Sequence, residues 1–517
     1  MRLHTRKIID RSFSAAGFFA ILLMALALVA ILLPIIYRGM QAYIFRATYE
    51  HRKVMLEEFG QGDRARIEGE AELIAEVRAP IYNMLEEFEA DLTGELQSIV
   101  REIRELAETE DNQRLTRSIN RRLRSISDGS TVEQLTDAVS RIRDTLSAQL
   151  NAEDYRELMA RIDAELAGTR GLNEKLSDLK SRLRHLLGPL PGDQKPEMPR
   201  FQYGQTRWGK AQEALDHIIH NYEWDYSDPQ RSGIRVQKLR VEQFRDTDLE
   251  PLFPYLEENL AEIMRPRLIF YWRFLTNRSR DAYFFGGIWP AVLGTFYLTV
   301  GAMIFAVPMG VIAAIYLCEY AKPSRTVSLL RSCISTLAGV PSIVFGLFGL
   351  AFFLNTIQVS ESKSVLAGSM TLALMILPTV IRASEEAILA VPMAYKEAAL
   401  GLGAGRWHTV LTVVLPAALP GILTGIVISM GRAAGETAPI IFTAAVSVGQ
   451  PLGITQVFDN PTQALPWNIY NLATEHEAVD EIRHVQFGMV FTLVALVLIL
   501  NVAAIALRAR ISKKLRG

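Results

Sequence analysis

Long uncharged apolar runs alternate with polar stretches along this chain, and the two kinds of segment are sharply separated. A helix needs about 20 apolar residues to cross the hydrocarbon core of a bilayer, and the runs are close to that length. The pattern predicts an all-α membrane protein with six spans, at residues 13–37, 289–320, 334–357, 365–381, 422–446 and 487–507.

The first run follows the basic residues Arg2, Arg6, Lys7 and Arg11, as the apolar segment of a signal peptide would. It is longer than the apolar segment of a signal peptide, and no small-x-small cleavage site lies between Pro34 and Arg38. We therefore interpret it as a retained span.

Basic residues near the ends of the spans predict the orientation, because Lys and Arg in short loops favour the cytoplasm. They fall on one side of the predicted bundle: the N-terminus, residues 322–331, residues 382–406 and the C-terminal tail from Arg508. We expect both termini to be cytoplasmic and the long polar stretch to lie outside. Three parts follow: 1–37 with the first span, an external insert at 38–282, and a membrane core at 283–517.

The insert carries apolar residues spaced by threes and fours, which is a coiled-coil seam, and we expect a long antiparallel helical hairpin or a small bundle. A turn is expected at Asp128–Gly129–Ser130, and the proline-rich stretch 188–199 should end the helical part. The seams are Ile81, Leu85, Phe88, Leu92, Leu96, Ile99, Ile103 and Leu106, then Leu135, Val139, Ile142, Leu146 and Leu150, then Leu172, Leu176, Leu179 and Leu183.

After the prolines the insert becomes richer in aromatic residues, and residues 234–241 alternate between apolar and basic as a short strand would. His217 and His220 lie one helical turn apart, but no third ligand accompanies them, so we expect a solvated helix face. The chain has two cysteines, Cys318 and Cys333, both in the membrane core. Packing, without disulfides, must therefore hold the insert together.

Residues 397–416, EAALGLGAGRWHTVLTVVLP, are polar and glycine-rich although they lie between two apolar runs. Glu397, Ala398 and Ala399 favour helix, whereas three glycines that follow, beginning with Gly401, interrupt it. Arg406 and Trp407 then present a charge and a large aromatic ring. This loop is suited to contact a partner, although an ordinary cytoplasmic loop is the alternative.

The spacing of Glu-Ala-Ala, Gly403 and Leu415-Pro416 resembles the EAA loop with which permease subunits of ABC importers bind a separate ATPase. From Gly286 onward the chain resembles the PstA-type permease subunit of the phosphate importer, except that this family has a much shorter first external loop. The segments that carry the likeness are GGIWPAVLGTFYLTV (286–300), AAIYLCEYA (313–321), GVPSIVFGLFGLAFF (339–353) and GRAAGETAPI (431–440).

The resemblance implies the type I importer permease fold in the inner membrane. It also implies a homologous second permease (PstC-like), a dimer of ATPase subunits (PstB-like) and a periplasmic phosphate-binding protein (PstS-like) as partners. The resemblance further implies that the loop couples the permease to the ATPase through Glu397, Ala398, Ala399, Gly403, Arg406 and Trp407.

Arg432 and Glu436 lie within the predicted fifth span, where charges normally pair or face a wet cavity. Their i, i+4 spacing would place both on one helix face. A guanidinium suits an oxyanion, so we interpret Arg432, Glu436 and the adjacent Thr437 as a translocation site. The alternative is an ion pair that only orients helices.

The sequence argues against an enzyme, since it has no G-x-x-x-x-G-K-[ST] loop and no cluster of metal ligands or catalytic residues. We expect no cofactor, no ATPase activity of its own, no nucleic-acid partner and contact with membrane lipid. The alternatives that stay open are a permease for sulfate or molybdate and a membrane sensor with an external helical domain. A sensor would need a cytoplasmic signalling module.

Overall fold

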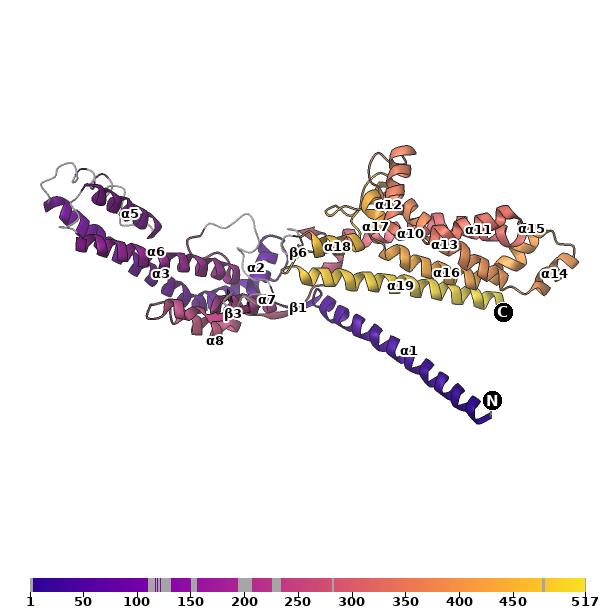
Figure 1. Ribbon diagram of the computed structural model, residues 1–517, viewed down its shortest axis with the longest axis horizontal. Coiled ribbons are helices and arrows are strands. Elements are labelled where there is room, and N and C mark those ends of the chain that lie inside the picture. Colours follow the sequence, from indigo (N-terminus) through magenta and orange to yellow (C-terminus); the bar gives the residue numbers. More distant parts are fainter. Residues whose placement is uncertain are drawn as a thin grey trace. The chain divides into compact units, whose positions relative to one another are not determined.

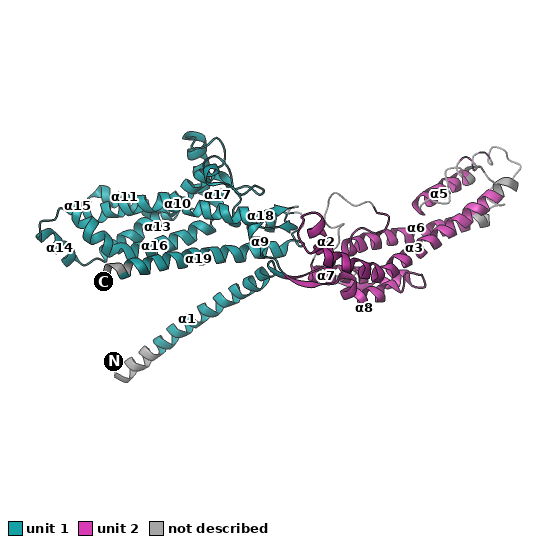
Figure 2. Ribbon diagram, turned by 180° about the vertical axis from the view of Figure 1, so that it is seen from behind, with its two compact units in different colours: residues 1–44, 270–517 teal, residues 45–269 magenta. Residues whose placement is uncertain are grey.

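The computed structural model describes residues 3–109, 132–149, 156–193, 207–225, 234–280, 283–476 and 479–516, with Arg117, Ile119 and Arg121. The chain forms two compact units: unit 1 is Met1–Ile44 with Phe270–Gly517, and unit 2 is Phe45–Ile269 (Figure 2). Unit 2 is therefore somewhat shorter than the insert expected at 38–282. The turn expected at 128–130, Leu150 and the segments 194–206 and 226–233 lie outside the described residues.

Unit 1 is almost entirely helical. Its α-helices are α1 (Leu3–Met40), α9 (Arg273–Thr276), α10 (Trp289–Ile315), α11 (Arg325–Ala338), α12 (Ser342–Gly349), α13 (Val365–Leu389), α14 (Met393–Gly401), α15 (Arg406–Thr409), α16 (Leu415–Gly435), α17 (Ala438–Thr443), α18 (Leu465–Thr474) and α19 (Arg483–Arg516). The shorter elements are the strands β5 (Ser279–Arg280) and β6 (Phe285–Gly286), the π-helical segments η3 (Tyr316–Tyr320), η4 (Leu350–Thr356) and η5 (Val410–Val414), and the 3₁₀ turn η6 (Ile454–Phe458).

Among the described residues, five helical stretches are long and apolar enough to cross a membrane: Ser12–Met40, Trp289–Tyr320, Val365–Leu389, Arg406–Gly435 and Arg483–Ile511. α10, α13, α16 and α19 lie side by side (Figure 1). These stretches agree with five of the six predicted spans, although α13, α16 and α19 begin or end several residues away from the predicted limits.

The span predicted at 334–357 is not one continuous helix. α11 and the continuous pair α12–η4 meet at an angle of 101°. The break coincides with Pro341, which has no N–H to donate and whose ring would clash with the carbonyl of Leu337 in a continuous helix. This segment is either a broken span or a re-entrant loop.

The helices of unit 1 approach one another closely at small residues. A Cβ on Gly310 of α10 would lie 2.6 Å from Cγ1 of Val380 in α13. A Cβ on Gly425 of α16 would lie 2.3 Å from the Cβ of Ala383 in α13. Such distances leave no room for a side chain, so these glycines set the spacing of the helices.

α1 joins this bundle only near its C-terminal end. A Cβ on Gly39 would lie 2.4 Å from the Cβ of Phe491 in α19, and the Arg38 guanidinium lies 5.2 Å from the Phe487 ring. The Tyr43 hydroxyl hydrogen-bonds Thr492 at 2.6 Å. The apolar part of α1 before this point is exposed in the isolated chain.

Unit 2 is mainly helical with two small two-stranded sheets. Its helices are α2 (Tyr49–Glu57), α3 (Arg64–Thr109), α5 (Val132–Gln149), α6 (Arg156–Leu187), α7 (Trp208–Ile219) and α8 (Leu252–Met264), with the 3₁₀ turn η2 (Arg240–Phe244). Its strands are β1 (Ile44–Ala47), which pairs with β4 (Arg267–Phe270), and β2 (His220–Asp225), which pairs antiparallel with β3 (Ile234–Leu239).

Two apolar clusters follow the length of α3. The first joins Leu92 and Leu96 to Leu135 of α5 and Leu176 of α6. The second includes Ile103 with residues farther along α5 and nearer the start of α6, namely Val139, Ile142, Ile162 and Leu166. α5 therefore runs parallel to α3 and α6 antiparallel to both. The seam residues Ile81 to Ile103 and Leu176 to Leu183 are buried.

Buried ion pairs tie the base of unit 2 together. The Arg78 guanidinium pairs with Glu50 at 2.8 Å and also donates to the carbonyls of Leu187 and Ile263. It thereby joins α2, α3, α6 and α8. Glu70 accepts a hydrogen bond from Arg52 and forms an ion pair with Arg267, which ties α3 to α2 and to β4.

Candidate coupling loop and translocation site

The first half of the 397–416 loop is a short helix on the outside of unit 1. α14 begins after Pro392 and contains Glu397, Ala398 and Ala399, and none of its residues is buried. Helix formation here agrees with the propensities of these three residues. The Glu397 side chain is exposed and available to a partner.

The spacing from Glu-Ala-Ala to Gly403 follows from how this helix ends. Gly403 has a φ of +86°, which favours glycine. Its N–H donates to the Leu400 carbonyl at 2.9 Å, and the next N–H, of Ala404, donates to the Ala399 carbonyl at 3.1 Å. This is a Schellman motif with Gly403 in the left-handed position. The motif turns the chain back toward the bundle.

The second half of the loop returns to the core through α15 and η5. Arg406 and Trp407 begin α15, both are exposed, and 59% of the Trp407 surface is accessible. Val410 and Val414 of η5 are buried against Val391 and Ile388. The loop therefore offers its charged and aromatic residues outward while apolar anchors hold it at both sides.

The sequence suggested that Arg432 and Glu436 lie within one continuous helix. They lie instead at a break between two helices. α16 ends at Gly435, and Glu436 is extended with φ −81° and ψ 125°. If the helix continued, the ring of Pro439 would clash with the carbonyl of Gly435. That carbonyl would also lack a hydrogen bond, because proline has no N–H. α17 begins two residues after Glu436, and Thr437 is its N-cap residue.

The two charges nevertheless contact each other. The Arg432 Nε donates to Oε1 of Glu436 at 3.4 Å, and 39% and 24% of the two side chains are exposed. The pair is long and partly open, so the Arg432 guanidinium retains donors for a further acceptor. An oxyanion could bind there without displacing the carboxylate completely.

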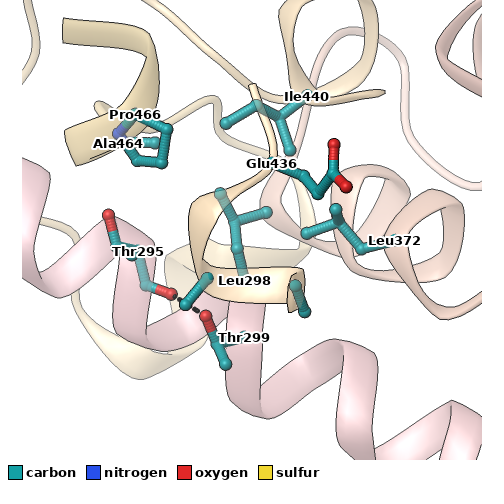
Figure 3. A pocket seen from close by; sticks show the side chains of 10 residues that line it. Thr295, Leu298, Thr299, Leu372, Glu436, Ile440, Ala464 and Pro466 are labelled. Atoms are coloured by element: carbon teal, nitrogen blue, oxygen red, sulfur yellow. Dashed lines mark hydrogen bonds between the residues drawn. The ribbon is translucent and has the colours of Figure 1, made fainter. Parts of the chain in front are cut away.

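Beside this break, a cavity of about 10 Å³ separates α10 from the α16–α17 connection, which is roughly the room one water molecule needs. Its lining includes Thr295 and Thr299 of α10 and, opposite them, Glu436 (Figure 3). The Thr299 hydroxyl donates to the Thr295 carbonyl at 2.7 Å. Sequence reasoning missed both threonines, since nothing in their spacing connects them with a residue far along the chain.

The histidine pair of unit 2 lies at the corner between α7 and β2. Within the described part of the chain, no group of three His, Cys, Asp or Glu residues could hold a metal ion. His220 Nδ1 lies 2.8 Å from Asp216 Oδ1, and the Tyr222 hydroxyl donates to the other oxygen of Asp216. The hydrogen bond from Tyr222 is the main cause that lowers the pKa of Asp216. The cluster stabilises the α7–β2 corner.

Unit 1 is similar to known membrane proteins. The family model for the binding-protein-dependent transport system inner membrane component matches residues 306–517, which include the 397–416 loop and Arg432 with Glu436. The probable ABC transporter permease protein YqgI of Bacillus subtilis is 34% identical over 252 residues, which are 47% of this chain and 85% of that protein.

Phosphate transport system permease proteins are similar as well. PstA 1 of Mycobacterium tuberculosis is 37% identical over 226 residues, which are 44% of this chain and 71% of that protein. PstA of Mycobacterium leprae is 36% identical over 235 residues, which are 45% of this chain and 74% of that protein. Each similarity covers less than half of this chain, and the matching family model begins after unit 2 has ended.

Proposed function

This chain belongs to the inner-membrane components of binding-protein-dependent transport systems, of the PstA phosphate permease type, and we propose that it carries inorganic phosphate across the membrane as a permease subunit of an ABC importer. The energy comes from a separate ATPase, as in ABC importers generally. The observation that carries the proposal is the Arg432–Glu436 pair at the break between α16 and α17.

Arg432 acts as a transient phosphate site in this proposal. Its guanidinium can donate two parallel hydrogen bonds to phosphate oxygens. Glu436 offsets part of the Arg432 charge and pairs with the guanidinium again when phosphate leaves the site. An arginine that is already paired binds an anion more weakly than a free one, and a transporter needs weak binding in order to release its substrate. Thr437 lies beside the site and adds a hydroxyl.

The 397–416 loop is the coupling element. Glu397, Ala398, Ala399, Gly403, Arg406 and Trp407 form the surface that enters a cleft of the ATPase. Because α14 has no buried residue, the ATPase can bind this helix and move it. ATP binding in the partner then switches the pathway from outward to inward facing.

The remaining subunits and the orientation follow from the same proposal. A second homologous permease completes the pathway, a dimer of ATPase subunits binds on the cytoplasmic side, and a periplasmic phosphate-binding protein delivers the substrate. Both termini and the 397–416 loop lie in the cytoplasm, and unit 2 lies in the periplasm as a mainly helical domain after the first span.

Substitution of Arg432 tests the translocation site. In the assembled complex, Arg432→Gln should abolish ATP-driven uptake of labelled phosphate, whereas Arg508→Gln on the exposed end of α19 should leave it unchanged. The exchange Arg432→Glu with Glu436→Arg should not restore uptake, since the cation would then sit in the connection instead of on α16. Full recovery by the exchange would identify a purely structural ion pair and contradict the proposal.

A further inference from the structure

The end of unit 1 that carries the 397–416 loop contains an ion pair that the function described above does not use. The Lys396 ammonium on α14 contacts the Glu319 carboxylate on η3, and only 13% and 17% of the two side chains are exposed. Lys396 directly precedes Glu397, so the pair connects the proposed ATPase-binding helix with the end of α10. Two charges so far from water are costly unless they stay together.

This contact matters because α14 has little else to hold it. None of its residues is buried, and the apolar anchors of the loop, Val391 and Val410, lie before and after the helix. A movement of α14 therefore reaches the bundle through α15 and η5 of the same loop, which α14 contacts, and through the Lys396–Glu319 pair.

The segment that receives the contact is joined to two more helices. Arg331 of α11 donates to the Leu317 carbonyl of η3 at 3.2 Å and lies 3.3 Å from the carboxylate of Glu385 in α13. η3 thus contacts α14 through Glu319 and α11 through Leu317, and the same arginine reaches α13.

η3 is π-helical, and its last turn closes through the Ala321 N–H and the Tyr316 carbonyl at 2.8 Å. A π-helical segment holds one residue more than an α-helical turn and commonly marks a functional site. Rewinding it would rotate Glu319 relative to α10. The other end of the same continuous helix, at Thr295 and Thr299, lines the cavity opposite Glu436.

We propose that the Lys396–Glu319 pair is the positioning contact through which movement of α14 is transmitted to α10 and from there to the connection that carries Glu436. The proposal rests on the function proposed above. Neither residue touches phosphate or ATP. The pair holds α14 and η3 in one register while the ATPase moves the loop.

A charge-exchange experiment in the reconstituted complex tests this. Lys396→Glu and Glu319→Lys, each alone, should leave the ATPase bound and hydrolysing ATP, while phosphate uptake per ATP hydrolysed falls about tenfold. The double exchange should recover most of the lost uptake. Lys322→Glu, which reverses an exposed charge near the end of η3, is the matched control and should change nothing.

The outcomes separate this proposal from the proposed function. A native complex that takes up no phosphate would overturn the function itself. The positioning role would be overturned in either of two cases in which the native complex takes up phosphate. In the first, the single variants take up as much phosphate per ATP as the native complex. In the second, the double exchange takes up no more phosphate than the single variants. If the reversals prevent assembly, Lys396→Met and Glu319→Gln replace them, and loss of ATPase binding in these milder variants would show that the pair shapes the docking surface and does not transmit movement.

Discussion

The two units of this protein are both mainly helical, yet the glycines of their helices have opposite surroundings. In unit 2, large aliphatic residues such as Leu96 and Leu176 fill the seams, and a Cβ added to the helical glycines Gly94 and Gly168 would meet nothing within 4 Å. In unit 1, glycines such as Gly310 and Gly425 lie where a methyl group would collide with the next helix.

The difference reflects the two solvents. Water drives apolar side chains of unit 2 together in proportion to the area that they bury. Lipid tails are as apolar as leucine, so helices in a bilayer gain by close van der Waals approach, which small residues permit. The effect of glycine therefore depends on the unit: it weakens a helix of unit 2, and it is required between helices of unit 1.

Replacement of glycine by alanine should have opposite effects in the two units. Gly425→Ala should abolish phosphate uptake, because the new methyl group would lie 2.3 Å from the Cβ of Ala383 and force α13 and α16 apart. Gly94→Ala should leave uptake intact and stabilise unit 2 by about 0.5–1 kcal/mol. Uptake by purified complexes and thermal unfolding of the 45–269 fragment measure the two effects. A fully active Gly425→Ala variant would refute the packing described for unit 1.

Truncation of a seam residue should destabilise unit 2. Leu96→Ala removes a fully buried side chain from the cluster that joins α3, α5 and α6, and should cost about 2–5 kcal/mol. Denaturant unfolding of the 45–269 fragment, which has its own core, measures the loss. Ala90→Ser on the exposed face of α3 serves as the control. A Leu96→Ala fragment as stable as the native one would mean that the seam does not hold unit 2 together.

Acid should weaken unit 2 through His51. Burial, then the charges of Arg207 and Arg52, lower the pKa of His51 from 6.5 to about 3. The unfolded chain therefore binds a proton that the folded one does not between these pKa values, and stability falls as the pH drops below 6.5. From pH 7.5 to pH 5.5 the fragment should lose about 1 kcal/mol, and His51→Asn should remove this part of the loss. Equal pH dependence of the two fragments would show that His51 does not contribute.

The smallest expected effect concerns residues 98–169 of unit 2. Replacement of residues 98–169 by a short glycine-serine linker should raise the phosphate concentration for half-maximal uptake while the maximal rate stays similar, if this part recruits the binding protein. Unit 2 contains 33 Lys and Arg against 43 Asp and Glu, a net charge of −10. Such a unit repels phosphate, so any gain must come from recruitment and not from direct capture. An unchanged concentration dependence would leave only a role in assembly or stability.

Much of this architecture could be predicted from local patterns. The apolar runs gave five spans, the seams gave the buried residues of α3 and α6, and the Glu-Ala-Ala spacing gave a helix that stops at Gly403. These features depend on residues close together in sequence.

The errors arose where a single proline overrides an apolar run. Pro341 breaks the predicted third span and Pro439 ends α16 before Glu436, although both residues were visible in the sequence. The contact of Lys396 with Glu319 and the cavity between Thr299 and Glu436 were not predictable, because they join residues far apart along the chain. The parallel course of α3 and α5 depends likewise on long-range packing.

Competition in uptake tests whether unit 1 is a phosphate permease driven by a separate ATPase. Proteoliposomes that contain this chain, its second permease and the ATPase dimer, with binding protein outside and ATP inside, should accumulate labelled phosphate. Excess unlabelled phosphate should abolish this accumulation, whereas equal concentrations of sulfate or molybdate should not reduce it. Accumulation of sulfate or molybdate in preference to phosphate, or uptake of phosphate that does not depend on ATP, would contradict the account.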